Sequence, residues 1–134
     1  MRVEKRQQLA TRRHWRVRQK VAGTAERPRM SVCFTNQNIH VQFVDDVKGA
    51  TLAAVSTTSK SVPDREKLGA NVKSAEVVGR LAAEAALAQG IKNVVFDRGG
   101  ARYHWSKGKG KDGKPVYGKV AALATAARAA GLKF

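Results

Sequence analysis

The sequence predicts an α/β domain in which helices cover a mixed β-sheet. Three consecutive segments between residues 30 and 57 are rich in β-branched and aromatic residues and are separated by short turns, which is typical of an antiparallel meander. A helical pattern over residues 71–89 leads to a short apolar segment at residues 91–97. Because a strand–helix–strand unit takes a right-handed crossover, the fourth strand should run parallel to a strand of the meander.

The first segment, residues 1–29, is predicted to be a basic helical arm outside the core. Residues 3–21 contain good helix formers and neither glycine nor proline, but their apolar residues form no continuous stripe that could pack on a core. Gly23 can end this helix, and Pro28 disfavours a helical residue before it. We expect the arm to be frayed alone and to become ordered on binding.

The globular domain is predicted to span residues 30–134 and to begin with three strands. These are expected at residues 30–35, 39–45 and 51–57. The Asn-Gln-Asn segment at 36–38 suits a tight turn. Cys33, the one cysteine of the chain, lies in the first of these strands and is expected to be buried and inert. A single cysteine allows no internal disulfide.

Two helices complete the predicted domain. Asn71 is expected to cap the first, which ends before Gly90. Apolar residues repeat at helical spacing along one face of this helix, from Ala75 to Ala85. The same spacing from Val120 to Ala127 marks a final helix, closed by Gly131.

Residues 105–117 are predicted to form a basic loop. Its sequence KGKGKDGK contains both GxGxxG and GxxxxGK, which cradle phosphate in nucleotide-binding enzymes. A dinucleotide-binding turn must follow a strand directly, yet ten residues separate Asp97 from Gly108. A phosphate loop needs Ser or Thr after its lysine, where this chain has Pro115. We therefore predict a flexible polycation that meets the phosphates of a larger partner, the alternative being a solvated surface loop.

The charge of the chain points to a polyanionic partner. Its 134 residues carry a net charge of +16, and such a surplus is typical of nucleic-acid-binding proteins. The excess is concentrated: residues 1–29 hold ten Lys and Arg against two acids, and residues 105–117 hold four against one. No membrane partner is expected, because no basic helix has a bulky apolar face and no segment approaches a membrane span. The arginine-rich beginning lacks serine, so we expect no targeting signal and a cytoplasmic protein.

An enzyme is the alternative class. Asp45, Asp46 and Asp97 lie at the ends of predicted strands, where a magnesium-dependent nuclease holds its metal. However, the first strand carries no acid, and turn and capping roles explain these aspartates better. The three histidines lack ligand spacing. We expect no catalysis, no metal and no cofactor.

Two clusters mix basic and aromatic residues. They are RRHWRVRQK at residues 12–20 and DRGGARYHW at residues 97–105. Arginine stacks on bases and bonds phosphates bidentately, and aromatic rings stack on unpaired bases. Two such clusters favour structured RNA over a DNA groove, for which a capped recognition helix would be expected.

The longer motifs resemble those of a known family. RRHWRVRQKVAGTAERPRMSV, DDVKGATLAAVSTTSK, FDRGG, YH and GKVAALATAARAAGLKF are similar to large-subunit ribosomal protein eighteen of the bacterial type, which binds 5S ribosomal RNA. The resemblance covers nearly the whole chain. It implies a ribonuclease-H-like fold without catalysis and a place, as a monomer, in the central protuberance of the large subunit. It also implies 23S RNA and neighbouring 5S-binding proteins as partners.

The resemblance and the basic pattern together give the expected RNA-binding residues. These are Arg12, Arg13, His14, Arg16, Arg18, Lys20, Arg27, Arg29, Asn36, Asn38, Arg98, Arg102, Tyr103, His104, Lys107, Lys109, Lys111 and Lys114. The first hairpin departs from the family pattern because it lacks cations, so its amides would supply hydrogen bonds instead. The family pattern also implies that residues 105–117 are an insertion. Trp105 and Tyr117 flank it and are expected either to pack together at its base or to make separate contacts.

Overall fold

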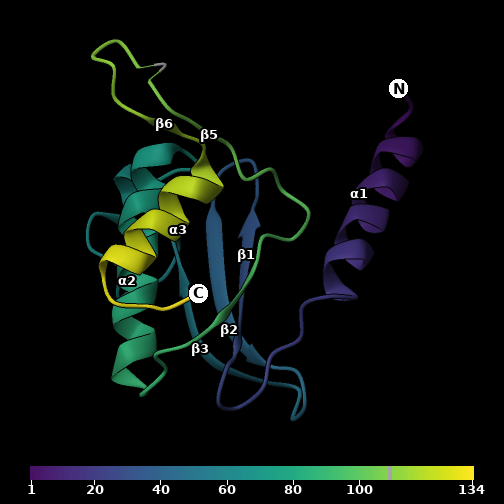
Figure 1. Ribbon diagram of the computed structural model, residues 1–134, viewed down its shortest axis with the longest axis vertical. Coiled ribbons are helices and arrows are strands. Elements are labelled where there is room, and N and C mark those ends of the chain that lie inside the picture. Colours follow the sequence, from purple (N-terminus) through teal and green to yellow (C-terminus); the bar gives the residue numbers. More distant parts are fainter. Residues whose placement is uncertain (109) are drawn as a thin grey trace.

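The computed structural model describes residues 1–108 and 110–134 (Figure 1). Its elements are the helix α1 (Val3–Arg18), the strands β1 (Arg29–Phe34), β2 (Ile39–Asp45) and β3 (Ala50–Ser56), a 3-10 turn (Arg65–Lys67), the helix α2 (Val72–Ala88), the strands β4 (Val95–Asp97), β5 (Trp105–Ser106) and β6 (Val116–Tyr117), and the helix α3 (Lys119–Ala129). None of the helices in this described part is long and apolar enough to span a membrane.

The main sheet is mixed, as the sequence predicts. Its strand order is β3-β2-β1-β4. β1 pairs with β2 in antiparallel and with β4 in parallel orientation, and β2 pairs with β3 in antiparallel orientation. The meander, the crossover helix and the parallel fourth strand of the ribonuclease-H-like arrangement are therefore confirmed.

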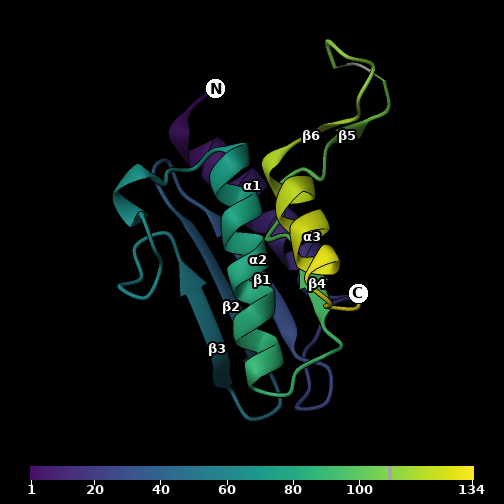
Figure 2. The same cartoon turned by 90° about the vertical axis from the view of Figure 1, so that its left-hand side faces the viewer.

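Helices α2 and α3 cover one face of this sheet (Figures 1 and 2). Alternate residues of β2, namely Ile39, Val41 and Phe43, are fully buried against them. The two helices pack closely because Gly79 of α2 has no side chain, since a Cβ atom there would overlap the carbonyl group of Leu123 in α3. This packing builds the core without any residue of α1, which buries none.

The helix ends follow the predicted signals. The side chain of Asn71 accepts a hydrogen bond of 2.8 Å from the backbone N–H of Ser74, as expected of a capping residue. Gly90 and Gly131 follow the ends of α2 and α3 with φ values of +78° and +115°, which residues with a side chain rarely adopt.

Two details differ from the predictions. Cys33 is exposed, so its predicted burial is wrong: only alternate residues of β1 face the helices, and Cys33 lies on the other face, opposite His40. The helix of the arm is also shorter than the predicted span of residues 3–21, because α1 ends at Arg18, and β1 begins one residue earlier than predicted, at Arg29.

The predicted basic loop has an ordered base. β5 and β6 form a two-stranded antiparallel ladder in which Trp105 is the partner of Tyr117. Of the two alternatives left open by the sequence, the backbone ladder favours pairing of these residues at the base. Tyr117 also packs against the core, while the segment between the strands projects outward (Figure 1). We call residues 105–117 the finger.

Candidate nucleic-acid interface

Helix α1 carries the first basic cluster and stands apart from the core. It lies on the side of the sheet opposite α2 and α3, and the chain after β4 passes between it and the sheet (Figures 1 and 2). Arg12, Arg13, His14 and Arg16 are all exposed. A helix with no buried face leaves its cations accessible to a partner.

The two basic clusters meet at a groove between α1 and the loop after β4. The groove has a volume of ≈ 370 Å³. Its lining residues are Arg13, Arg16, Val17, Lys20, Val21, Arg98, Gly100 and Arg102. Five of these are cations and none is an acid. These like charges repel one another, and an anion that enters the groove reduces the repulsion.

Two glycines let this loop reach α1. Gly99 and Gly100 have φ values of +60° and +82°, in the left-handed region that favours glycine. A Cβ atom on Gly100 would lie 3.2 Å from the Cβ atom of Arg13. The side chain of Asp97 fixes the start of the loop by accepting a hydrogen bond of 2.8 Å from the N–H of Gly99. The DRGG motif is therefore the wall of the groove opposite α1.

Arg29 was expected to contact RNA, but the structure uses it inside the protein. Its side chain is 12% exposed. The guanidinium donates hydrogen bonds to Asp46 (Nε to Oδ2, 2.9 Å, and Nη2 to Oδ1, 3.0 Å) and to Asp97 (Nη1 to Oδ2, 2.8 Å). The sequence alone did not predict this role, because Arg29 lies at the end of the basic arm, whose cations were expected to be exposed. The signal was present in the acids at the ends of neighbouring strands.

Arg18 and Asp46 join α1 to the sheet. The Arg18 guanidinium donates to both carboxylate oxygens of Asp46 at 3.2 and 3.3 Å. Hydrogen bonds from Arg29, with further help from the Gly23 N–H and the charge of Arg18, hold the pKa of Asp46 well below its usual range against the opposing effect of burial. Asp46 therefore stays ionised and bonded at any physiological pH.

The aspartates offer no metal site of the kind that a nuclease needs. The Asp45 side chain accepts hydrogen bonds from the N–H groups of Val47 and Lys48 at 3.0 and 3.3 Å, which is the predicted turn role. Asp46 and Asp97 are bonded to arginine. Over residues 1–108 and 110–134, no three His, Cys, Asp or Glu side chains gather closely enough to hold a metal ion.

The other expected residues divide between surface and fold. Asn36 and Arg27 are exposed, whereas Asn38 is half-buried and its Oδ1 accepts a hydrogen bond of 2.9 Å from the Thr57 hydroxyl. Tyr103 is 43% exposed, and His104 beside it is exposed.

The finger forms a second basic surface. Lys107, Lys111 and Lys114 are exposed on it, and Lys109 lies outside the described residues. Both views place the finger apart from α1 (Figures 1 and 2). The structure therefore joins the two basic-aromatic clusters at the groove but leaves Lys107, Lys111 and Lys114 at a separate place.

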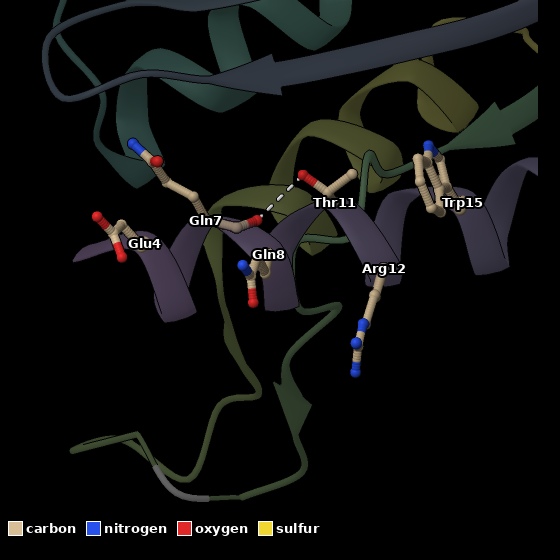
Figure 3. A pocket seen from close by; sticks show the side chains of 6 residues that line it. All are labelled: Glu4, Gln7, Gln8, Thr11, Arg12 and Trp15. Atoms are coloured by element: carbon tan, nitrogen blue, oxygen red, sulfur yellow. Dashed lines mark hydrogen bonds between the residues drawn. The ribbon is translucent and has the colours of Figure 1, made fainter. Parts of the chain in front are cut away.

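The face of α1 away from the groove has no net charge, because it holds one acid and one cation (Figure 3). It presents Glu4, Gln7, Gln8, Thr11, Arg12 and Trp15. The Thr11 hydroxyl donates to the carbonyl of Gln7 at 3.0 Å, and Trp15 is 64% exposed. Arg12 and Trp15, although part of the first cluster in sequence, do not line the groove.

Comparisons with known proteins identify the family of this chain. A family model described as ribosomal L18 of archaea, bacteria, mitochondria and chloroplasts matches residues 4–134. The large ribosomal subunit protein uL18 of Clostridium botulinum (strain Langeland) is 46% identical over 129 residues, which cover 96% of this chain and 95% of the relative. The protein of the same name from Lactobacillus delbrueckii subsp. bulgaricus is 50% identical over 126 residues, with 94% and 92% covered. This chain belongs to the ribosomal L18 family, whose members are structural proteins of the large ribosomal subunit and not enzymes.

Proposed function

We propose that the chain binds 5S ribosomal RNA and helps to attach it to 23S RNA in the central protuberance of the large subunit. The observation that carries this proposal is the groove between α1 and the loop after β4, lined by five cations and no acid. Membership of the ribosomal family supports a ribosomal RNA as the partner, and the groove offers the cations that would bind its phosphates. We further propose a cytoplasmic ribosome, a monomeric state within it, and neighbouring 5S-binding proteins as partners.

The groove suits an RNA backbone. Arg13 and Arg16 on one wall and Arg98 and Arg102 on the other carry planar guanidinium groups that bond phosphate oxygens bidentately. Val17 and Val21 add apolar lining to the groove, which suits the sugar edge of a nucleotide. Entry of phosphates releases counterions and relieves the repulsion between the walls, and both effects favour binding at low salt.

Exposed aromatic side chains of the two basic clusters, outside the groove itself, add a means to recognise unpaired bases. Trp15 on α1 and Tyr103 beyond the loop are both exposed, and each ring can stack on a base. Arg29 and Asn38 take no direct part in this proposal, because their polar groups bond within the protein.

Substitution of one arginine from each wall tests the proposal. We expect Arg16→Gln and Arg102→Gln each to weaken binding of 5S RNA by roughly tenfold to a hundredfold, the range for hydrogen bonds to charged groups. Lys73→Gln is the matched control, since Lys73 is an exposed cation at the start of α2, behind the other face of the sheet. Filter binding over a series of salt concentrations measures all three.

The controls distinguish a specific RNA-binding site in the groove from non-specific electrostatic attraction of RNA to a basic protein. Transfer RNA at the same concentration should bind more weakly than 5S RNA and should not distinguish the variants from each other. Equal losses for Arg16→Gln, Arg102→Gln and Lys73→Gln would show that only net charge matters and that the groove is not the binding site.

A further inference from the structure

Asp46 is the point at which the arm is bonded to the sheet. Its Oδ2 accepts a hydrogen bond of 2.7 Å from the N–H of Gly23, and its own N–H donates to the Gly23 carbonyl at 3.1 Å. It also accepts hydrogen bonds from the guanidinium groups of Arg18 and Arg29. We call Asp46, Arg18, Gly23 and Arg29 the Asp46 junction.

The fit of Gly23 fixes the chain at this junction. Gly23 is buried, and a Cβ atom there would overlap the backbone of Arg29 and of Val44. The linker after α1 therefore lies directly against β1 and β2. Arg18, the last residue of α1, adds the second attachment close to the groove.

Helix α1 has little else to hold it in place. It buries no residue, and no side chain caps its beginning. In the described part of the chain, the bonds from Arg18 to Asp46 are the only side-chain hydrogen bonds between α1 and the sheet. The direction in which α1 points therefore depends on the Asp46 junction.

The junction also reaches the opposite wall of the groove. Arg29 bonds Asp46 on one side and Asp97 on the other, and Asp97 holds the N–H of Gly99. A continuous series of charged hydrogen bonds thus runs from the end of α1 to the loop that faces it. Asp97 is fully buried, so this series is shielded from salt better than surface pairs are.

We propose that Asp46 is a positioning residue for RNA binding, which sets the separation between α1 and the loop after β4 at which the groove forms. This inference rests on the proposed function of the groove. It predicts that removing the negative charge of Asp46 changes the affinity for RNA in the direction opposite to simple electrostatic attraction. Asp46 is an anion in a protein that binds a polyanion, so simple electrostatics predicts tighter binding when it is neutralised, whereas positioning predicts weaker binding.

The position of α1 can be measured without RNA. Cys33 is the one cysteine of the chain and is exposed, and Gln8→Cys would add a second exposed label site on α1. Spin labels on both sites give the distribution of distances between α1 and the sheet. We expect a narrow distribution in the otherwise unchanged protein and a broad one with Asp46→Asn or Arg18→Gln.

Glu26→Gln is the matched control, because Glu26 is an exposed acid in the same linker. It should leave the distribution narrow. A distribution that stays narrow with Asp46→Asn would overturn the proposal. Since no RNA is involved, this result stands even if the partner of the groove is not 5S RNA.

Binding of 5S RNA by the same variants, without spin labels, tests whether the position of α1 affects RNA binding. We expect Asp46→Asn to weaken binding by roughly tenfold, although it removes a negative charge, and to lower the salt dependence by more than the value for one phosphate, about 0.7–0.9 log unit. Glu26→Gln should bind as the parent does or slightly more tightly. Asp46→Glu, which keeps the charge, should recover part of the affinity. Equal or tighter binding by Asp46→Asn would refute the positioning role.

If Asp46→Asn proves poorly folded, a comparison of Arg18→Gln with Arg12→Gln still tests the proposal. Arg18→Gln leaves the bonds of Arg29 in place, and Arg12→Gln removes an equal charge from a part of α1 outside the groove. Arg18→Gln should lower the salt dependence more than Arg12→Gln does, because it frees the whole helix. Equal effects of the two substitutions would count against the junction.

Discussion

Arg29 is 12% exposed and bonded to two carboxylates, whereas Arg13 and Arg16 are exposed and line the groove. All three belong to one basic stretch of sequence. The difference lies in the acids nearby: Arg29 meets Asp46, which follows β2, and Asp97, which ends β4, and a largely buried guanidinium needs such partners. At the scale of the residue, an arginine can therefore either form ion pairs within the protein or stay exposed to bind an anion, and its neighbours determine which.

The pKa of Asp46 leads to a prediction about stability. Its native pKa lies below that of the unfolded chain, so its contribution is complete above the ordinary carboxyl value of about 3.9 and is lost as the pH falls from there towards the native pKa. We expect Asp46→Asn to cost roughly 1.5–3 kcal/mol at neutral pH, the range for hydrogen bonds to charged groups. This difference should stay constant down to about pH 5 and shrink below about pH 4.

Thermal unfolding by circular dichroism across this range measures the effect. The charged groups that face Asp46 are the guanidinium groups of Arg18 and Arg29, and arginine keeps its charge in this range. Asp97, beyond Arg29, is present in both proteins. A difference between the two proteins that is the same at pH 3 as at pH 7 would contradict an ionised Asp46 as its source.

At the scale of the element, α1 and the finger are two projections built in different ways. α1 is a helix without a buried face, bonded at its C-terminal end. The finger is closed by the β5–β6 ladder, and its base is anchored through Tyr117 in the core. Its exposed cations are lysines, which act on phosphate mostly as point charges and do not read bases.

Deletion of residues 106–116 tests the finger. Because the core lies in the main sheet and α2 and α3, we expect the melting temperature and the affinity for isolated 5S RNA to change little. Incorporation into the large subunit should fall, and the deficit should shrink at high salt, where charges are screened. Subunits reconstituted with the deletion variant and with the parent protein provide the measurement. A collapsed fold would make the finger a core element, and normal incorporation at every salt concentration would make it an idle surface feature.

At the scale of the whole molecule, charge and core are separated. Residues 1–29 carry net +8 of the total +16, while residues 30–104 carry only +2. The core is built by the sheet with α2 and α3. Residues 30–104 are thus nearly neutral, and the excess lies in the arm, the finger and the C-terminal segment, so that repulsion between the cations costs the core little.

Removal of residues 1–20 tests this division. We expect the remaining domain to fold, since α1 buries nothing. Binding to 5S RNA should weaken strongly, and the salt dependence should flatten by about 0.7–0.9 log unit for each phosphate that the arm no longer neutralises. Circular dichroism and binding titrations at several salt concentrations give both quantities. An unchanged salt dependence would show that the arm is merely solvated.

The sequence by itself determined the elements of this protein. Alternation in β2, the stripe of small apolar residues in α2, and the signals at Asn71, Gly90 and Gly131 depend on local chemistry, so they could be read from neighbouring residues. The parallel placement of β4 followed from a general rule of chain crossover. The basic clusters were also visible, because charge is a property of composition.

Tertiary structure alone decided which residues act together. The clusters at 12–20 and 97–105 form one groove because Gly100 lets the loop approach α1. Arg29 is withdrawn from the surface because Asp46, which follows β2, and Asp97, which ends β4, both bond it, and Cys33 is exposed because β1 turns it away from the helices. Each of these outcomes depends on contacts between residues far apart in sequence, and local pattern does not specify which of the candidate residues meet.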